Sequence, residues 1–461
     1  MRKAIRVITA LLAAALLFAL WWFMEGKGEL EAYSSGEPAE ETYSVQPQKQ
    51  TLRLWYADDA FTDFFNECAV AYNARQNRVR VETKLITDLD YIKQVNDASV
   101  AGGEYPDLFL VGNNALERCV LGGLAAQVQD TEHFSDPTVY PQTARYAVTF
   151  GGRTYAYPLC FETAALLYNE EYLQAMSAAN GSDTMTIPST IIDIINLAGN
   201  YNAPEKVDAI FKWDVSDIFF NYYFIGAYLN MGGPCGDDES QLDVYNQQLI
   251  SCLKVYQQLT QFFSIDTQTD DYDSLIRDFA GGRIVFTVAT SDAVERLRKM
   301  QERGETDIRY GVVRLPDSTN SLQTKSLSIT DCLVVNGYSE LQEEANLFIR
   351  YMIYSHLDGF YDRTGKAPAL SAYEYSDAHM KGFVEAYENS VPLTKLREAS
   401  NFWMLLENTF ANVWNGADAN ESLRQLAKQL MIQITGSEGI EIERIDDPPY
   451  VDIIAELTGG E

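Results

Sequence analysis

Residues 155–169 read YAYPLCFETAALLYN, and this stretch decides how the chain is organised. It begins as a β-strand, passes Pro158 and continues as an apolar run, which predicts an extended segment that leaves one layer and enters another. Glu162 is the only charged residue between Arg153 and Glu170. A carboxylate in so apolar a setting is either paired or lies beside a ligand cleft. Spacing alone leaves a buried strand with one capping carboxylate open.

The length and charge of the chain limit its class. With 461 residues it is too long for one hydrophobic core, so two or three domains are expected. A content of 46% hydrophobic and 22% charged residues is typical of a globular protein. The net charge of −31 repels phosphate backbones and anionic lipid, so nucleic-acid binding is not expected. An acidic surface also favours solubility, and it identifies no ligand.

The N-terminus carries an export signal. Residues 4–24, AIRVITALLAAALLFALWWFM, form an apolar run about long enough to span a bilayer. Basic residues precede the run and acidic residues follow it, which orients the rest of the chain outside. We expect residues 1–24 to be a membrane anchor. A cleaved signal peptide is the alternative, although no small-x-small cleavage site follows the run. Residues 25–50 are polar and acidic, which predicts a disordered linker.

Residues that carry enzyme or metal chemistry are scarce. The six cysteines have no CxxC spacing, and the three histidines, His133, His356 and His379, form no HExxH motif, so we expect no metal site. Disulfide pairing and buried free thiols both stay open for the cysteines. No GxSxG, GxxxxGK[ST] or GxGxxG motif occurs, and we therefore expect no catalytic residues and no cofactor.

The folded part begins with alternating strand and helix patterns. Strands are predicted from residue 52, over 79–85 and over 107–111, and helical spacing lies between them. This βαβαβ order predicts a parallel sheet with right-handed crossovers. Ligands of such sheets bind beyond the carboxyl ends of the strands, here residues 55–59 and 112–114. The two loops are expected to face one cleft.

Seven stretches occur in an order and spacing that resembles a known family. They are LRLWYADD (52–59), GEYPDLFLVGNNALERCVLGGLAAQV (103–128), YAYPLCFETAALLYNEEYL (155–173), DFAGGRIVFTVAT (278–290), YGVVRLP (310–316), RTGKAPAL (363–370) and SNFWMLLENTFANVWNGADANESLRQLAKQL (400–430). Together they resemble the extracellular solute-binding proteins of ABC importers, in the carbohydrate-binding branch that includes the maltodextrin-binding proteins. The resemblance covers about residues 51 to 435.

The resemblance implies an α/β fold of two lobes, like that of periplasmic binding proteins, joined by three hinge crossings. The crossings are expected near residues 157–162, 327–331 and 366–371. The expected divisions are an anchor or signal (1–24), a linker (25–50), lobe 1 (51–160), lobe 2 (161–328), a returning part of lobe 1 (329–368), the C-terminal helices of lobe 2 (369–435) and a tail (436–461). Each lobe is therefore discontinuous in sequence.

The resemblance also implies a function. The chain is expected to be an exported, membrane-tethered monomer that binds a sugar or short oligosaccharide and delivers it to the permease subunits of an ABC importer. It is expected to be no enzyme. A tethered ligand sensor with the same fold is one alternative. A glycoside hydrolase is another, because Asp58, Asp59 and Glu162 include enough carboxylates for the pair that such chemistry needs.

A sugar site needs aromatic faces that stack on pyranose rings and planar polar groups that bond hydroxyls. The candidate ligand-binding residues are Trp55, Asp58, Asp59, Asn113, Asn114, Glu162, Trp213 and Trp403. The resemblance assigns Glu162 a ligand contact at the first crossing and Trp403 an aromatic platform on lobe 2. Core packing is the alternative for both Trp55 and Trp403, and a cap or turn role is the alternative for the two asparagines.

Two positions depart from the family pattern. Val111 stands where maltodextrin-binding relatives carry an aromatic residue, and Thr290-Ser291 stand in place of a Gly-Pro-Trp segment. Two stacking platforms are therefore missing, which favours a mono-, di- or short oligosaccharide over a long glucan. Another polar solute stays open.

Overall fold

The computed structural model describes residues 49–451 and 453, with the side chains of 131, 135, 398 and 399 excepted. The chain divides into a unit of residues 1–49 and a compact unit of residues 50–461, and the fold described here is that of the second unit. The predicted anchor (1–24) and nearly all of the predicted linker (25–50) lie outside the described residues. Gln50 belongs to the first strand, so the folded part begins one residue earlier than predicted.

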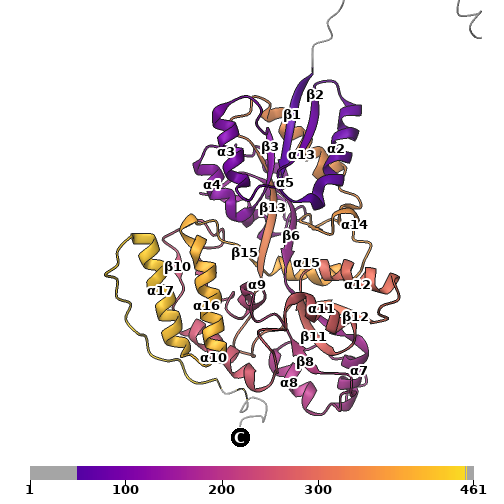
Figure 1. Cartoon of the computed structure of the whole chain (residues 1–461), viewed down its shortest axis with the longest axis vertical. Helices are drawn as coiled ribbons and strands as arrows, with labels where there is room; N and C mark the ends of the chain where they lie inside the picture. Colours follow the sequence, from indigo (N-terminus) through magenta and orange to yellow (C-terminus); the bar gives the residue numbers. More distant parts are fainter. Residues whose placement is uncertain (1–48, 452, 454–461) are drawn as a thin grey trace, which may run out of the picture. The chain divides into compact units, whose positions relative to one another are not determined.

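Lobe 1 is built on a seven-stranded sheet (Figure 1). Its strands are β1 (Gln50–Tyr56), β2 (Val79–Leu85), β3 (Leu108–Gly112), β6 (Tyr157–Thr163), β13 (Leu327–Val335), β14 (Ala367–Pro368) and β15 (Val391–Pro392). Helices α2 (Thr62–Arg75), α13 (Gln342–Ser355) and α14 (Phe360–Thr364) cover one face, and α3 (Tyr91–Ala101) and α4 (Leu116–Leu121) cover the other. Because helices cover both faces, successive residues of a central strand are both buried.

The predicted parallel arrangement is correct for β1, β2 and β3. Strand β13 runs antiparallel to both β3 and β6, so the whole sheet is mixed. The reason is topological: β6 takes the chain out of this lobe, and the strand that brings the chain back must run the opposite way. The βαβαβ pattern of the sequence does not contain this returning strand.

Lobe 2 is built on a four-stranded sheet in the order β12-β7-β11-β8. The strands are β7 (Ala165–Asn169), β8 (Ala209–Lys212), β11 (Ile284–Ala289) and β12 (Tyr310–Val313). Around them pack α7 (Glu170–Ala179), α8 (Ile191–Gly199), α11 (Tyr272–Ala280), α12 (Asp292–Glu302) and α15 (Met380–Glu388). Gly382 lets α15 approach β12 closely, because a Cβ there would lie 2.3 Å from the carbonyl oxygen of Val312.

The stretch 155–169 changes sheets, as its pattern predicts. It forms β6 in the seven-stranded sheet up to Thr163 and β7 in the four-stranded sheet from Ala165, so the change falls at Ala164. Strand β13 brings the chain back to the first sheet from Leu327 onward, and β14 pairs with β6 before the chain continues to α15. After α15 the chain touches the first sheet again, because β15 pairs with the start of β13. The sequence did not predict this last contact.

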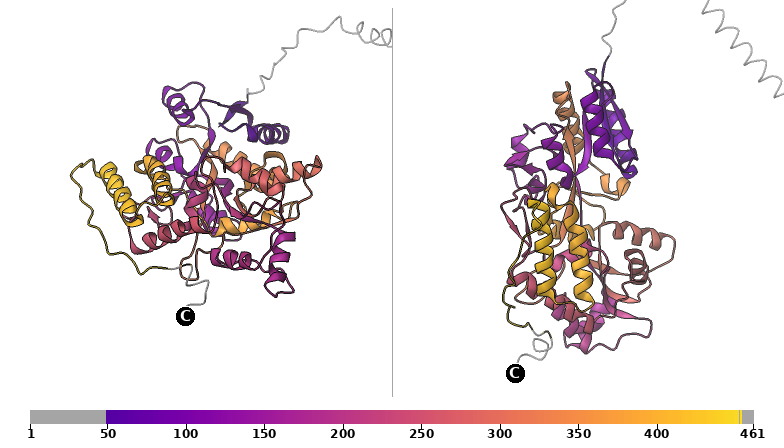
Figure 2. Two further views of the ribbon diagram at one scale, coloured as in Figure 1. Left: turned by 60° about the horizontal axis from the view of Figure 1, so that its bottom comes forward. Right: turned by 60° about the vertical axis from the view of Figure 1, so that its left-hand side comes forward.

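Three further helices complete lobe 2. They are α10 (Gln247–Gln258), α16 (Phe402–Trp414) and α17 (Ala419–Thr435), which pack against one another (Figures 1 and 2). Their apolar faces join the large core that also holds Phe211 and Phe286 of the sheet.

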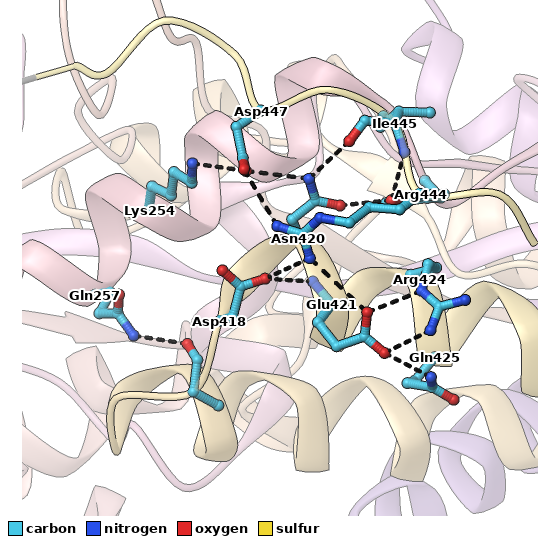
Figure 3. Close-up of polar contacts among 12 residues, drawn as sticks. Lys254, Gln257, Asp418, Asn420, Glu421, Arg424, Gln425, Arg444, Ile445 and Asp447 are labelled. Atoms are coloured by element: carbon cyan, nitrogen blue, oxygen red, sulfur yellow. Dashed lines mark hydrogen bonds and ion pairs between the residues drawn. The ribbon is translucent and has the colours of Figure 1, made fainter.

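Residues 442–451 of the predicted tail run past α17 and α10 without regular secondary structure (Figure 3). Arg424 donates to the carbonyl oxygen of Ile442 at 3.0 Å, and Asn420 donates to that of Ile445 at 3.0 Å. Lys254 of α10 pairs with Asp447 at 2.8 Å. We call residues 442–451 the C-terminal strap, since it ties two helices of lobe 2 together.

The described residues contain neither a disulfide bond nor a membrane-spanning helix. All six cysteines are free thiols, and all but Cys235 are buried. Within residues 49–451 no helix has the length and apolarity needed to cross a membrane.

Candidate functional site: a cleft at the carboxyl ends of β1 and β3

Two cavities lie next to each other at the carboxyl ends of β1 and β3. The Trp403 cavity, of about 380 Å³, is lined by Asn114, Ala115 and Arg118 of lobe 1 and by residues 394–397, Ser400 and Trp403. The Asp331 cavity, of about 220 Å³, is lined by residues 57–58, Gly112 and Asp331, among others. Ile92 and Ala115 line both cavities, so the two are adjacent. This is the position that the strand order predicts for a ligand.

Local capping fixes the first loop of the cleft. The side chain of Asp58 accepts a hydrogen bond from the backbone N–H of Ala60 at 2.9 Å and so begins the short helix η1 (Asp59–Phe61). The second carboxylate oxygen of Asp58 pairs with the ammonium of Lys366 at 3.1 Å. Asp58 therefore lines the Asp331 cavity with its charge already balanced.

Glu162 is solvent-exposed on β6, and no hydrogen bond or ion pair to its carboxylate occurs within the described residues. Protein atoms nevertheless surround it at longer range, and this desolvation raises its pKa above the ordinary value. Lys366, which continues the β14 register opposite Glu162, acts in the other direction and lowers the pKa. Glu162 is thus an accessible carboxylate without a protein partner in a recessed position, as a ligand contact would be.

Asp331 is the second acid at the crossing strands. It lies on β13, pairs in register with Cys160 and accepts a weak hydrogen bond from the Cys160 thiol at 3.6 Å. Burial raises its pKa, and Lys366 opposes this shift. Glu162 pairs with Ile329, two residues before Asp331, so the two carboxylates are diagonal neighbours of the paired strands.

Lobe 2 contributes two more carboxylates to this field. The charges of Asp292 and Asp217 both raise the pKa of Glu162. Asp292 is the first residue of α12 and accepts a hydrogen bond from the Tyr272 hydroxyl at 2.7 Å. Asp217 caps α9 (Ile218–Asn221) through the backbone N–H of Phe219. Carboxylates from both lobes therefore raise the pKa of Glu162, while the ammonium of Lys366 lowers it.

Trp403 gives the Trp403 cavity an aromatic wall. It is the second residue of α16, is half-buried, and its ring centroid lies 5.9 Å from that of buried Tyr222. Asn114 lies on the lobe 1 side of the same cavity and is exposed. The cavity thus has an indole from one lobe and an amide from the other.

The two other candidate tryptophans lie in hydrophobic cores, and their prediction as cleft residues is wrong. Trp55 is 4% exposed and packs on the α3 and α4 side of the sheet, because both faces of β1 are covered. Trp213 is 0% exposed, and its indole N–H donates to Asn221 at 2.9 Å. For Trp55 the core alternative is therefore the correct one.

Two polar candidates have structural roles instead. Asn113 is fully buried, donates to the carbonyl oxygen of Leu393 at 2.7 Å and accepts from the backbone N–H of Thr330 at 3.0 Å. Asp59 lines neither cavity, and its carboxylate accepts from the Thr62 hydroxyl at 3.0 Å at the start of α2. Asp58, Asn114 and Trp403 are the candidates that line the two cavities. Glu162 lines neither, but it is the diagonal neighbour of Asp331, which lines the Asp331 cavity.

Sequence reasoning missed Asp331, Lys366 and the segment 394–397. A signal for Asp331 existed, since it is the only charged residue between Lys325 and Glu340, as Glu162 is in its own stretch. Lys366 belongs to the stretch RTGKAPAL, which supports the resemblance and the third crossing but indicates no site residue. Nothing in the local pattern of residues 394–397 indicates a cavity wall.

No family model matches the chain. It is 20% identical over 343 residues to the maltodextrin-binding protein MdxE of Bacillus subtilis, covering 69% of this chain and 75% of that protein. It is 23% identical over 256 residues to a maltotriose-binding protein of Pyrococcus abyssi, covering 55% of this chain and 50% of that protein. These relatives agree with the resemblance read from the sequence.

Solved structures share the fold. An extracellular solute-binding protein from Staphylococcus aureus in complex with maltose has a TM-score of 0.71 at 18% identity, covering 84% of this chain and 99% of that one. The maltose-binding periplasmic protein MalE of Listeria monocytogenes, also in complex with maltose, has a TM-score of 0.68 at 19% identity, covering 84% and 98%. A cyclo/maltodextrin-binding protein complexed with maltotetraose has a TM-score of 0.71 at 16% identity, covering 85% and 99%. The predicted two-lobed fold is confirmed.

Proposed function

We propose that this chain, which has the fold of the extracellular solute-binding proteins, captures a saccharide between its two lobes and delivers it to the permease subunits of an ABC importer. One observation carries the proposal: the indole of Trp403 and the amide of Asn114 line the same cavity, which lies beyond the carboxyl end of β3. The partnerless carboxylate of Glu162 supports it, because Glu162 is the diagonal neighbour of Asp331, which lines the adjacent cavity. The names of the relatives, which bind maltodextrin and maltotriose, support it.

The chemistry of the cleft suits a neutral sugar. An indole face packs against the C–H face of a pyranose ring, and the carboxylate and amide of Glu162 and Asn114 accept and donate bonds to its hydroxyls.

The size of the cleft suits a short saccharide. The Trp403 cavity of about 380 Å³ is at the small end of typical ligand pockets, which span about 300–1,000 Å³. Val111 and Thr290-Ser291 supply no aromatic platform. We therefore propose a mono-, di- or short oligosaccharide as ligand.

The proposal includes the setting of the protein. The chain is an exported monomer held at the outer face of the membrane by residues 1–24, with one lobe built on the seven-stranded sheet and the other on the four-stranded sheet. It performs no catalysis of its own, and its carboxylates serve binding. Sedimentation of the exported protein with membranes, with an intact N-terminus on sequencing, is the expected result for the anchor.

Thermal-shift screening of the full chain against maltose, maltotriose and maltotetraose tests binding, and isothermal titration then gives the affinity. We expect at least one of these sugars to raise the melting temperature, and no reducing sugar to be released from the longer ones. No shift with any of the three would contradict a maltooligosaccharide ligand, and sugar release would favour the hydrolase. Import into cells that carry the chain, compared with cells that lack it, separates transport from sensing.

A further inference from the structure

One buried charge near the cleft has no role in the proposed binding chemistry. Lys395 lies in the segment between β15 and the short helix η5 (Arg397–Asn401), and its side chain is 1% exposed. The ammonium donates hydrogen bonds to the carbonyl oxygens of Tyr146, at 2.9 Å, and of Cys235. A buried ammonium is costly unless such bonds hold it, so its position is specific.

The two carbonyl groups belong to separate elements. Tyr146 is the next-to-last residue of α6 (Gln142–Ala147), where the negative end of the helix dipole favours a cation. Cys235 lies in a loop of lobe 2, residues 232–237, between β9 (Asn230–Met231) and β10 (Leu242–Asp243). Lys395 therefore joins three segments that are far apart in the sequence.

The backbone around Lys395 makes further hydrogen bonds to loop 232–237. The N–H of Lys395 donates to the carbonyl oxygen of Gly236 at 2.7 Å, and the Thr394 hydroxyl donates to it at 3.1 Å. Gly236 has a φ of +64°, and a Cβ there would lie 2.9 Å from the Cα of Thr394. Loop 232–237 and the segment at Thr394 approach each other so closely that only glycine fits at position 236.

The anchored segment forms a wall of the cleft. Residues 394–397 line the Trp403 cavity, and the chain then passes through η5 to Trp403 itself. One residue earlier, the carbonyl oxygen of Leu393 accepts from buried Asn113 of lobe 1. Loosening the segment at Lys395 would therefore shift the wall that carries the aromatic platform.

We propose that Lys395 is a positioning residue of the ligand cleft: its buried ammonium clamps residues 393–397 between α6 and the glycine-rich loop 232–237 and so fixes the wall that carries Trp403. The inference rests on the proposed function, because it assigns a role in that same cleft.

The charge of Lys395 titrates in a measurable range. Burial lowers its pKa to about 8, while Cys235, Asp237 and Cys332 act weakly in the opposite direction. Burial raises the pKa of both thiols, so Lys395 loses its proton first. The other titratable groups on the elements packed around it are Arg145 and Tyr146 on α6, Glu117, Arg118 and Cys119 on α4, and Arg397. Above pH 8 the neutral amine binds the two carbonyl groups less well, and the clamp weakens.

The test compares Lys395→Met and Lys395→Gln with the wild type in titrations with maltotetraose from pH 6.5 to 9.5. We expect the wild-type Kd to rise about tenfold across this range, as for the loss of one charge-assisted hydrogen bond. Lys395→Met should bind about tenfold more weakly at pH 6.5, with little pH dependence. Lys395→Gln retains N–H donors without a charge, so it should recover part of the affinity and stay independent of pH.

The matched control is Lys381→Met, which removes an ammonium that is 82% exposed on α15 and should behave as wild type. Wild-type affinity in Lys395→Met, or the same pH dependence in that variant, would overturn the proposal. Amide hydrogen exchange of the free protein tests the clamp without ligand: at one pH, exchange at residues 395–396 should be faster in Lys395→Met. If maltotetraose does not bind the wild type, the proposed ligand fails, and unchanged exchange would still refute the clamp.

Discussion

Replacing Trp403 by alanine separates a cleft residue from a core residue. The indole is half-buried, and it packs against Tyr222 at a centroid distance of 5.9 Å while lining the cavity of about 380 Å³. An indole at a binding contact is often a hot spot worth about 2 kcal/mol, which corresponds to a Kd about thirtyfold higher. The loss of stability should stay well below the about 3–5 kcal/mol of a fully buried tryptophan.

The matched control for this prediction is Trp414→Ala, because Trp414 lies at the other end of α16, is also half-buried and packs on Trp213 at 5.7 Å. It should lower the melting temperature without changing the Kd. Trp55→Ala should destabilise the free protein most, since Trp55 is 4% exposed.

Isothermal titration with maltotetraose gives the Kd of each variant, and thermal melting of the free protein gives its melting temperature. Equal losses of affinity in Trp403→Ala and Trp414→Ala, or an unchanged Kd with a lowered melting temperature in Trp403→Ala, would refute the assignment of Trp403 to the binding site.

Three further results are expected. The pKa of Glu162 is raised in the folded protein, so the charged carboxylate destabilises the fold above that pKa. Glu162→Gln should therefore raise the melting temperature near neutral pH while weakening sugar binding. The affinity of the wild type should fall as pH drops through the raised pKa of Glu162. The pKa values of Glu421 and Asp447 are lowered to about 2. The C-terminal strap should therefore stay bound at any pH above the ordinary carboxyl pKa values and be released as the pH falls toward 2. Hydrogen exchange of residues 442–451 measures this release, and high salt should speed the exchange. A bound sugar should reduce the radius of gyration in small-angle scattering, because hinge closure concentrates motion in the crossings; an unchanged radius with proven binding would contradict hinge closure from an open free state.

The sequence by itself determined the features that depend on local pattern. Strands β1, β2 and β3 follow from short apolar runs, and the change of sheets in residues 155–169 follows from a strand pattern that passes Pro158 and continues as an apolar run. Glu162 stands out as the only charged residue of that stretch, and Trp403 by its place in a resemblance that extends over most of the folded chain. Asp58 and Asn114 were identified because the carboxyl ends of neighbouring parallel strands meet at one edge of a sheet.

Only the tertiary structure decided which polar and aromatic residues reach the cleft. In the sequence, Trp55 and Trp213 are candidates for the cleft like Trp403. In the structure, helices cover both faces of β1, which buries Trp55, and Trp213 is enclosed in the core of lobe 2. The burial of a side chain depends on what packs against its strand, which local sequence does not record. Lys395 joins elements near residues 146, 235 and 395, and Asp331 meets Glu162 across a strand pair 169 residues apart. Contacts of such separation leave no periodic trace, since local spacing records only neighbours within a turn or a strand.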